Sequence, residues 1–335
     1  MILVLLLCAA LWGLGWVLEA PRSQRWLALG AIWAAAFVWF RVPLDLASDA
    51  ARVWVLVTAA ALLVFGYTRL LGLLKRRAQP PVPQGVKPLF QPEELDRYAR
   101  HILLREIGGP GQKALKQARV LVIGAGGLGS PVLMYLAAAG VGQIAVMDDD
   151  VVEASNLQRQ IIHRTASIGT DKVASAMAAM LGLNPFTAVQ AIKARFGVGA
   201  DLTEYDLILD GSDNFDTRYL TNRMAANAGK PLISAAITQW EGQISLYDPA
   251  HGTPCYECVF PNRPAPGMVP TCAEAGVAAP LPGVIGSMMA MEAVKHLTGA
   301  GAGLKGRLMI YDALYAEVRV IGIQPRPDCA VCGHG

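Results

Sequence analysis

The stretch RVLVIGAGGLGS, residues 119–130, decides the fold of the larger part of this chain. It opens with a short apolar run of the kind that forms a buried strand, and its glycines mark a tight turn that leads into a helix. Gly124, Gly126 and Gly129 have the spacing of a dinucleotide-binding turn, in which the backbone comes close to a nucleotide. Free N–H groups and the helix dipole favour negative charge there. The stretch therefore predicts a Rossmann-like domain that binds a nucleotide.

The segments around this stretch alternate between strand and helix patterns. Buried strands are predicted in QIAVMD, YDLILD, KPLISAA and GQISLYD, and edge strands in RLMIYDA and AEVRVIGI. Helices are predicted in EELDRYARHILLREIG, GQKALKQA, DKVASAMAAML, DTRYLTNRMAANAG and GVIGSMMAMEAVKHLT. Alternating apolar strands and helices indicate an α/β domain whose sheet is mostly parallel and covered on both faces.

The composition indicates a second kind of region at the N-terminus. With 53% hydrophobic residues among 335 and a mean hydropathy of +0.37, the chain is too apolar for an ordinary soluble protein of this size. The excess lies in the runs 2–18, 26–40 and 53–74. Because a helix needs about 20 apolar residues to cross a bilayer, we predict a transmembrane region of about three helices over residues 1–77. The second run is short, so a re-entrant segment stays open for it.

Charge and proline content predict how the parts are arranged. Basic residues at 22, 25 and 75–77 flank the apolar runs and would face the cytoplasm. The proline-rich stretch 78–92 predicts a linker, and 93–335 predicts the folded domain. We therefore expect a multi-pass protein of the inner cell membrane with its folded domain in the cytoplasm. A net charge of +3, without a basic run interleaved with aromatic residues after residue 77, excludes nucleic acid as the indicated partner.

The residues after the strand QIAVMD narrow the choice of nucleotide. Asp148 ends that strand about 20 residues past the glycine turn, where an acid hydrogen-bonds a ribose hydroxyl. By itself this acid predicts an NAD-binding oxidoreductase. However, SNLQRQ places Asn156 and Arg159 just past the acid, and Lys172 follows at a helix start. Two cations at this place suit a triphosphate, whose charge shifts during reaction, better than they suit a nicotinamide. The alternative that Arg159 and Lys172 are simply a solvated pair on the surface stays open.

Two Cys-x-x-Cys pairs form a second chemical motif. CYEC contains Cys255 and Cys258, and CAVC contains Cys329 and Cys332. Four thiolates at this spacing suit a closed tetrahedral Zn²⁺ site with a structural role. Disulfides are the weaker alternative in a reducing compartment, and a redox pair lacks its usual context. Zinc would fasten the C-terminal tail to the body of the domain.

In order and spacing, these motifs resemble those of the MoeB/ThiF/HesA family, bacterial relatives of ubiquitin-activating enzymes. The matching stretches are RYARHILLREIG, GAGGLGS, AAAGVGQIAVMDDD, SNLQRQ, GTDKV, LILDGSDN, EGQISLY, CYEC, TCAEAGV, GVIGSMMAMEAVK and CAVC. The resemblance implies an adenylyltransferase that uses ATP and Mg²⁺ to adenylate the C-terminal glycine of a ubiquitin-like sulfur-carrier protein ending in Gly-Gly. Molybdopterin or thiamine type sulfur transfer would be its setting. It further implies a homodimer, and the sulfur donor is expected to be a separate protein.

The resemblance also implies roles for individual residues. Arg159 and Lys172 would screen the repulsion between the attacking carboxylate and the polyphosphate. Asp213 would anchor Mg²⁺, a hard ion that needs oxygen ligands, and Arg100 would reach into the site of the partner subunit. The nucleotide-binding set implied by the resemblance is Gly124, Gly126, Gly127, Gly129, Asp148, Ser155, Asn156, Arg159, Lys172, Asp213 and Asn214.

A few residues and one functional alternative stay open. Cys272, in VPTCAEAGV, matches a position where some relatives form a covalent bond to the carrier, and an incidental thiol is the alternative. Asp149 and Asp150 could assist metal or partner binding, or simply end the strand in water. His163 is expected to pack near the nucleotide site. A catalytically silent membrane scaffold that recruits a ubiquitin-like partner is the alternative to the enzyme.

Overall fold

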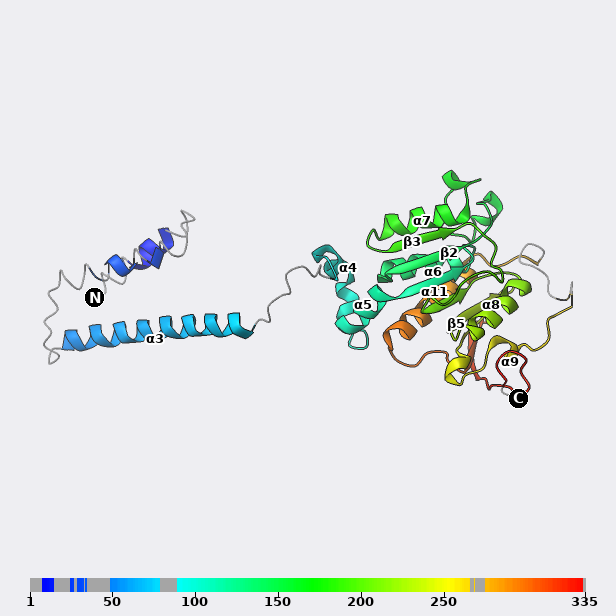
Figure 1. Ribbon diagram of the computed structural model, residues 1–335. Helices are drawn as coiled ribbons and strands as arrows, with labels where there is room; N and C mark the ends of the chain where they lie inside the picture. Colours follow the sequence, from blue (N-terminus) through cyan, green and yellow to red (C-terminus); the bar gives the residue numbers. More distant parts are fainter. Residues whose placement is uncertain are drawn as a thin grey trace. The chain divides into compact units, whose positions relative to one another are not determined.

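The computed structural model describes residues 8–14, 25–26, 29–32, 34, 49–78, 89–265, 268 and 275–333 (Figure 1). The chain divides into two compact units, Met1–Lys87 and Pro88–Gly335. The second unit contains the whole sheet and the candidate site.

In the first unit the main described element is α3 (Asp49–Ala78), an α-helix of 30 residues. It covers the predicted apolar run 53–74, whereas the runs 2–18 and 26–40 lie mostly outside the described residues. A membrane crossing requires about 20 apolar residues in one helix, and no described helix is both long and apolar enough to meet that requirement. This finding overturns the predicted multi-pass localisation in the inner cell membrane and the membrane as a partner, both of which rested on composition.

The second unit is built on a sheet of eight strands in the order β3-β2-β1-β4-β5-β6-β7-β8. The pairs from β3 through β5 are parallel, and those from β5 through β8 are antiparallel. The strands are β1 (Arg119–Ile123), β2 (Gln143–Met147), β3 (Ala188–Ile192), β4 (Leu207–Asp210), β5 (Leu232–Ile237), β6 (Glu241–Tyr247), β7 (Arg307–Asp312) and β8 (Glu317–Gly322). The chain leaves β1 toward β2 on one side and later returns to β4 on the other, so a crevice is expected between β1 and β4.

Helices cover both faces of this sheet (Figure 1). They are α4 (Pro92–Ile102), α5 (Gly108–Gln117), α6 (Gly129–Ala139), α7 (Lys172–Leu183), α8 (Phe215–Asn227), α9 (Tyr256–Val259) and α11 (Pro280–Thr298). Alternate residues of β1 enter separate cores, because successive side chains of a strand point to opposite faces. Val120 and Val122 pack with α5, α6, α7 and α11, whereas Leu121 and Ile123 pack with α8 and α9.

The structure confirms the predicted α/β Rossmann-like fold with a mostly parallel sheet and departs from the prediction in three places. The sequence pattern missed β3, whose residues AVQAI at the sheet edge are only partly buried and lack the continuous apolar run of the inner strands. The predicted edge strand RLMIYDA is β7, which lies inside the sheet between β6 and β8. The single helix predicted for EELDRYARHILLREIG ends at Ile102, and α5 begins at Gly108, where φ is +58°.

Candidate functional site

A cavity of about 740 Å³ opens where β1, β2 and β4 end. Its walls come from the glycine turn after β1, the acidic segment after β2, residues 194–196 after β3 and residues 211–215 after β4. These loops meet because parallel strands place their carboxyl ends at one edge of the sheet. The cavity therefore occupies the crevice at the point where the strand order reverses, which is where open α/β sheets bind ligands.

The glycine turn is shaped by contacts that exclude side chains. Gly124 has φ of +93°, and a Cβ there would lie 3.1 Å from the carbonyl oxygen of Gly211. A Cβ on Gly129 would lie 1.9 Å from the carbonyl oxygen of Gly124, so no other residue fits. Gly126 and Gly127 line the cavity, whereas Gly129 lies behind it at the start of α6. The turn thus presents bare backbone to a ligand.

Asp148 lies beside this turn at the end of β2. Its Oδ2 accepts a hydrogen bond from the Ala125 N–H at 2.7 Å, and its Oδ1 accepts one from the Asp150 N–H at 2.9 Å. Each carboxylate oxygen can accept a further hydrogen bond. The half-buried carboxylate is therefore held in one orientation and keeps acceptor capacity toward the cavity, of which it forms part of the wall.

The two predicted cations also line the cavity. Arg159 donates from Nη2 to Oδ1 of Asn156 at 3.1 Å, so Asn156 orients the guanidinium and does not itself line the cavity. The Lys172 side chain is only 6% exposed, and its ammonium donates to Oδ2 of the exposed Asp150 at 2.7 Å. Ser155 is exposed away from the cavity walls. Both basic side chains therefore lie at this crevice.

The loop after β4 brings an acid and an amide to the same cavity. Asp213 is exposed and has no hydrogen-bond or ion-pair partner among the residues that the structure describes. Asn214 caps α8, since its Oδ1 accepts from the Thr217 N–H at 2.9 Å. Both residues line the cavity. The loop therefore offers a carboxylate that is free to bind a cation.

A buried polar network supports this loop. Asp210 is fully buried and accepts hydrogen bonds from the N–H and hydroxyl of Ser212 and from the hydroxyl of Ser234, at 3.0, 2.6 and 2.9 Å. The Nε of Arg218 lies 3.5 Å from Oδ2 of Asp210. The Nη2 of Arg218 donates to the carbonyl oxygens of Ser212 and Ala235 at 2.8 and 2.9 Å. The network joins the ends of β4 and β5 to the first turns of α8.

The cavity also contains residues that the sequence pattern did not single out. Arg195, Arg218 and Arg263 line it, and Arg263 forms an ion pair with Asp216. Gln160 lines it too, is 5% exposed, and has a side-chain oxygen without a hydrogen-bond partner among the described residues. Arg218 lies one helical turn after Asn214, a spacing that could have signalled it. Arg195 and Arg263 carried no such signal, because only the tertiary structure brings their loops to this cavity.

Arg100 was predicted to reach the site of a partner subunit. Arg100 is exposed on α4 and does not line the cavity of its own chain. Its helix is fastened to the domain by the Tyr98 hydroxyl, which accepts from Nδ2 of Asn184 at 2.8 Å, and by an ion pair between Glu94 and Lys116. Cys272 lies outside the described residues.

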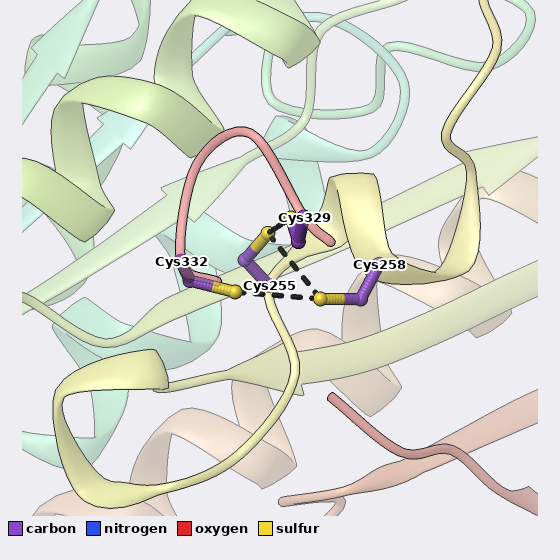
Figure 2. A group of neighbouring side chains, drawn as sticks. All are labelled: Cys255, Cys258, Cys329 and Cys332. Carbon is purple, nitrogen blue, oxygen red and sulfur yellow. Dashed lines mark hydrogen bonds between the residues drawn. The ribbon is translucent and has the colours of Figure 1, made fainter. Parts of the chain in front are cut away.

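The four predicted cysteines come together where the C-terminal tail meets α9 (Figure 2). The sulfur atoms of Cys255 and Cys329 are 3.6 Å apart, and those of Cys258 and Cys332 are 3.3 Å apart. All four lie within 4.8 Å of one another. This is the donor set of a closed tetrahedral zinc site.

The thiols of this cluster differ in acidity. Burial raises the pKa of Cys255 strongly and that of Cys332 to about 11. Burial also acts to raise the pKa of Cys329, but hydrogen bonds with the backbone N–H groups of Cys332 and Val331 and with the thiols of Cys255 and Cys258 together lower that pKa to about 7. Such a cluster of neighbouring thiols favours a cation that would stabilise their thiolate forms.

Together the fold and the cavity define a nucleotide-binding protein of the Rossmann-like class. A model of the ThiF family matches residues 98–331, and the chain belongs to that family. The sulfur carrier protein adenylyltransferase of Thermus thermophilus is 49% identical over 248 residues, which cover 72% of this chain and 92% of that protein. The SAMP-activating enzyme E1 of Haloferax volcanii is 47% identical over 245 residues, with 72% and 90% covered.

Other proteins extend this comparison. The mouse adenylyltransferase and sulfurtransferase MOCS3 is 43% identical over 76% of this chain but over only 56% of its own length. The crystal structure of E. coli MccB with MccA-N7isoASN has the same fold, with a TM-score of 0.62, 23% identity, and 72% of this chain and 75% of that chain covered. The family and the Thermus and Haloferax relatives confirm the predicted enzyme class: this protein is an ATP-dependent adenylyltransferase.

Proposed function

We propose that this adenylyltransferase activates the C-terminal glycine of a ubiquitin-like sulfur-carrier protein ending in Gly-Gly. The main support is the single cavity that gathers the glycine turn, Asp148, Arg159, Lys172 and Asp213. The Thermus relative, a sulfur carrier protein adenylyltransferase, and the Haloferax relative, a SAMP-activating enzyme E1, support the substrate class. Molybdopterin or thiamine type sulfur transfer is the proposed setting, with a separate protein as sulfur donor.

In this proposal the nucleotide lies along the glycine turn. Asp148 accepts hydrogen bonds from the ribose, while Arg159 and Lys172 face the phosphates. Lys172 then exchanges its contact with Asp150 for a phosphate oxygen, so Asp150 serves as its counter-ion in the nucleotide-free site. The glycine carboxylate is already ionised at neutral pH, so positioning and charge stabilisation carry most of the catalysis.

Homodimerisation would complete the site. Arg100 is exposed on a helix that is firmly attached to its own domain, and it lies outside the cavity of its own chain. We propose that it reaches the cavity of a second copy, where it adds a third cation against the polyphosphate. The two sites of a dimer would then each depend on both subunits.

The donor atoms of the cavity fit Mg²⁺. The exposed carboxylate of Asp213 offers oxygen ligands, which Mg²⁺ prefers. When bound, the ion would neutralise charge that develops on the departing pyrophosphate. Asp213 would hold it, and Asn214 would keep that loop in place through its cap on α8.

The four-cysteine cluster fits Zn²⁺. Cys255, Cys258, Cys329 and Cys332 supply four thiols and leave no protein position for water, which is typical of a structural site. We propose that zinc binds there and joins the tail to the segment around α9.

ATP–pyrophosphate exchange by the full chain, with Gly-Gly-ended carrier proteins, tests the proposed function. We expect exchange that depends on the carrier and is lost in Asp213→Asn, because the amide cannot replace a carboxylate as the Mg²⁺ anchor. Asp216→Asn is the matched control, since Asp216 is also exposed and close in sequence but does not line the cavity.

ATP binding without exchange with any carrier would instead favour the silent scaffold. Exchange by Asp213→Asn at the unsubstituted rate would contradict the role of Asp213. Cys272→Ala should retain exchange even if a later covalent step to the carrier is lost.

A further inference from the structure

His163 is a buried histidine that contacts the glycine turn without lining the cavity. It is 6% exposed, and its Nε2 lies 2.9 Å from the carbonyl oxygen of Ala125. Its Nδ1 lies 2.9 Å from the hydroxyl of Ser175 on α7. A carbonyl oxygen can only accept, so Nε2 carries a proton, and in the neutral ring the Ser175 hydroxyl then donates to Nδ1. Burial lowers the pKa of His163, which favours this neutral form.

Ala125 is consequently held on both sides. Its N–H donates to Asp148, and its carbonyl accepts from His163. In a planar trans peptide the carbonyl of one residue and the N–H of the next point in opposite directions. Holding the Ala125 carbonyl against the imidazole therefore turns the N–H of Gly126 away from His163.

The N–H of Gly126 is the group that this arrangement makes available. Gly126 lines the cavity, and its N–H has no hydrogen-bond partner within the described part of the chain. Apart from the neighbouring residues of the chain, a Cβ on Gly126 would meet only Nε2 of Gln160, at 3.6 Å, so the side-chain side of this residue is open. A free N–H just before the start of α6 is suited to a phosphate oxygen.

We propose that His163 is a positioning residue for nucleotide binding, which fixes the Ala125–Gly126 peptide so that the Gly126 N–H donates to a phosphate of the bound nucleotide. The inference rests on the proposed function for its ligand. Simple packing of the ring would not require the Nε2–H, whereas positioning of the peptide does.

Three substitutions in the full chain separate these two roles. His163→Gln keeps an N–H donor near the place of Nε2, and His163→Leu keeps side-chain bulk without a donor. His296→Gln is the matched control, because burial also lowers the pKa of His296, which lies on α11 outside the cavity wall. The binding of ATP and of adenosine is measured by titration calorimetry.

The expected result is a loss of ATP affinity when residue 163 has no hydrogen-bond donor. His163→Leu should weaken ATP binding about tenfold, the scale of one hydrogen bond to a charged group, with a smaller effect on adenosine. His163→Gln and His296→Gln should bind ATP about as the unsubstituted chain does. Unchanged ATP affinity in His163→Leu would overturn the proposal, and so would equal losses in His163→Leu and His163→Gln.

A second measurement needs no nucleotide. Hydrogen exchange of the segment 121–130 should be faster in His163→Leu than in His163→Gln, because only the former frees the Ala125 carbonyl. Equal exchange in the two variants would overturn the positioning role. If hydrogen exchange differs between the two variants while the unsubstituted chain binds no ATP, His163 still positions the turn. The proposed function then fails instead.

Discussion

Asp210 and Asp213 lie close together in sequence and have opposite surroundings. Asp210 is fully buried and is satisfied by two serine residues and Arg218, whereas Asp213 is exposed at the cavity without a partner among the described residues. A buried carboxylate needs such partners because burial without them is costly. The sequence motif LILDGSDN indicated Asp213 but gave no reason to separate it from Asp210, since burial is a property of the folded sheet.

Replacing Arg218 should reveal this difference as a loss of stability. Arg218→Met leaves the Asp210 carboxylate buried without its counter-ion, and we expect a loss of about 3–5 kcal/mol in the free energy of unfolding. Urea denaturation followed by circular dichroism measures it.

Arg263→Met is the control for this prediction. It breaks an exposed ion pair with Asp216 and should cost about 0–1 kcal/mol. Similar losses in the two variants would contradict the structural role assigned to Arg218.

At the scale of elements, the site depends on how closely α6 approaches the glycine turn and α11. A Cβ on Gly286 of α11 would lie 2.4 Å from the carbonyl oxygen of Leu128, so these helices meet nearly backbone to backbone. The start of α6 and its glycines were predictable from local pattern. The partner helix α11 was also predicted. Its contact with α6 could not be predicted from a local pattern, because it joins distant parts of the chain.

Two glycine substitutions test the close approach at the start of α6. Gly129→Ala should destabilise the domain strongly and abolish ATP binding, because its Cβ would overlap the Gly124 carbonyl oxygen. Gly182→Ala, on α7, meets nothing within 4 Å and should be neutral or stabilise by about 0.5–1 kcal/mol through helix propensity.

Thermal denaturation of both variants, with ATP titration of any folded protein, provides the measurement. A folded Gly129→Ala variant with normal ATP affinity would contradict the described geometry of the turn.

At the scale of the whole molecule, the cysteine cluster joins the end of the chain to the segment around α9. The two Cys-x-x-Cys pairs are far apart in sequence, yet their sulfur atoms gather within 4.8 Å (Figure 2). The sequence predicted that the two pairs come together, because four thiolates suit one zinc ion. It also predicted membrane spans from composition, and that prediction was wrong for the described helices, because apolar content alone does not ensure a helix long and apolar enough to cross a bilayer.

Removal of one thiol should loosen this connection. Cys329→Ser should lose bound zinc and lower the melting temperature, because metal-binding free energy contributes to the stability of the folded state. Cys8→Ser, in the first unit and outside the cluster, is the control and should retain the metal.

Metal analysis of the freshly purified, reduced protein and calorimetric melting check this prediction. Zinc-free protein that melts at the same temperature with and without Cys329 would contradict a metal clip.

The sequence by itself determined the strand–turn–helix nucleotide motif, the alternation of strands and helices, and the types of residue in the candidate site. These follow from local rules, since glycine spacing, apolar period and ligand chemistry are legible along a chain. Only the tertiary structure decided that β3 completes the sheet, that Arg195, Arg218 and Arg263 share the cavity with Arg159, and that His163 holds the Ala125 carbonyl. Each of these depends on contacts between segments distant in sequence, and such contacts exist only once the sheet has brought its strand ends together.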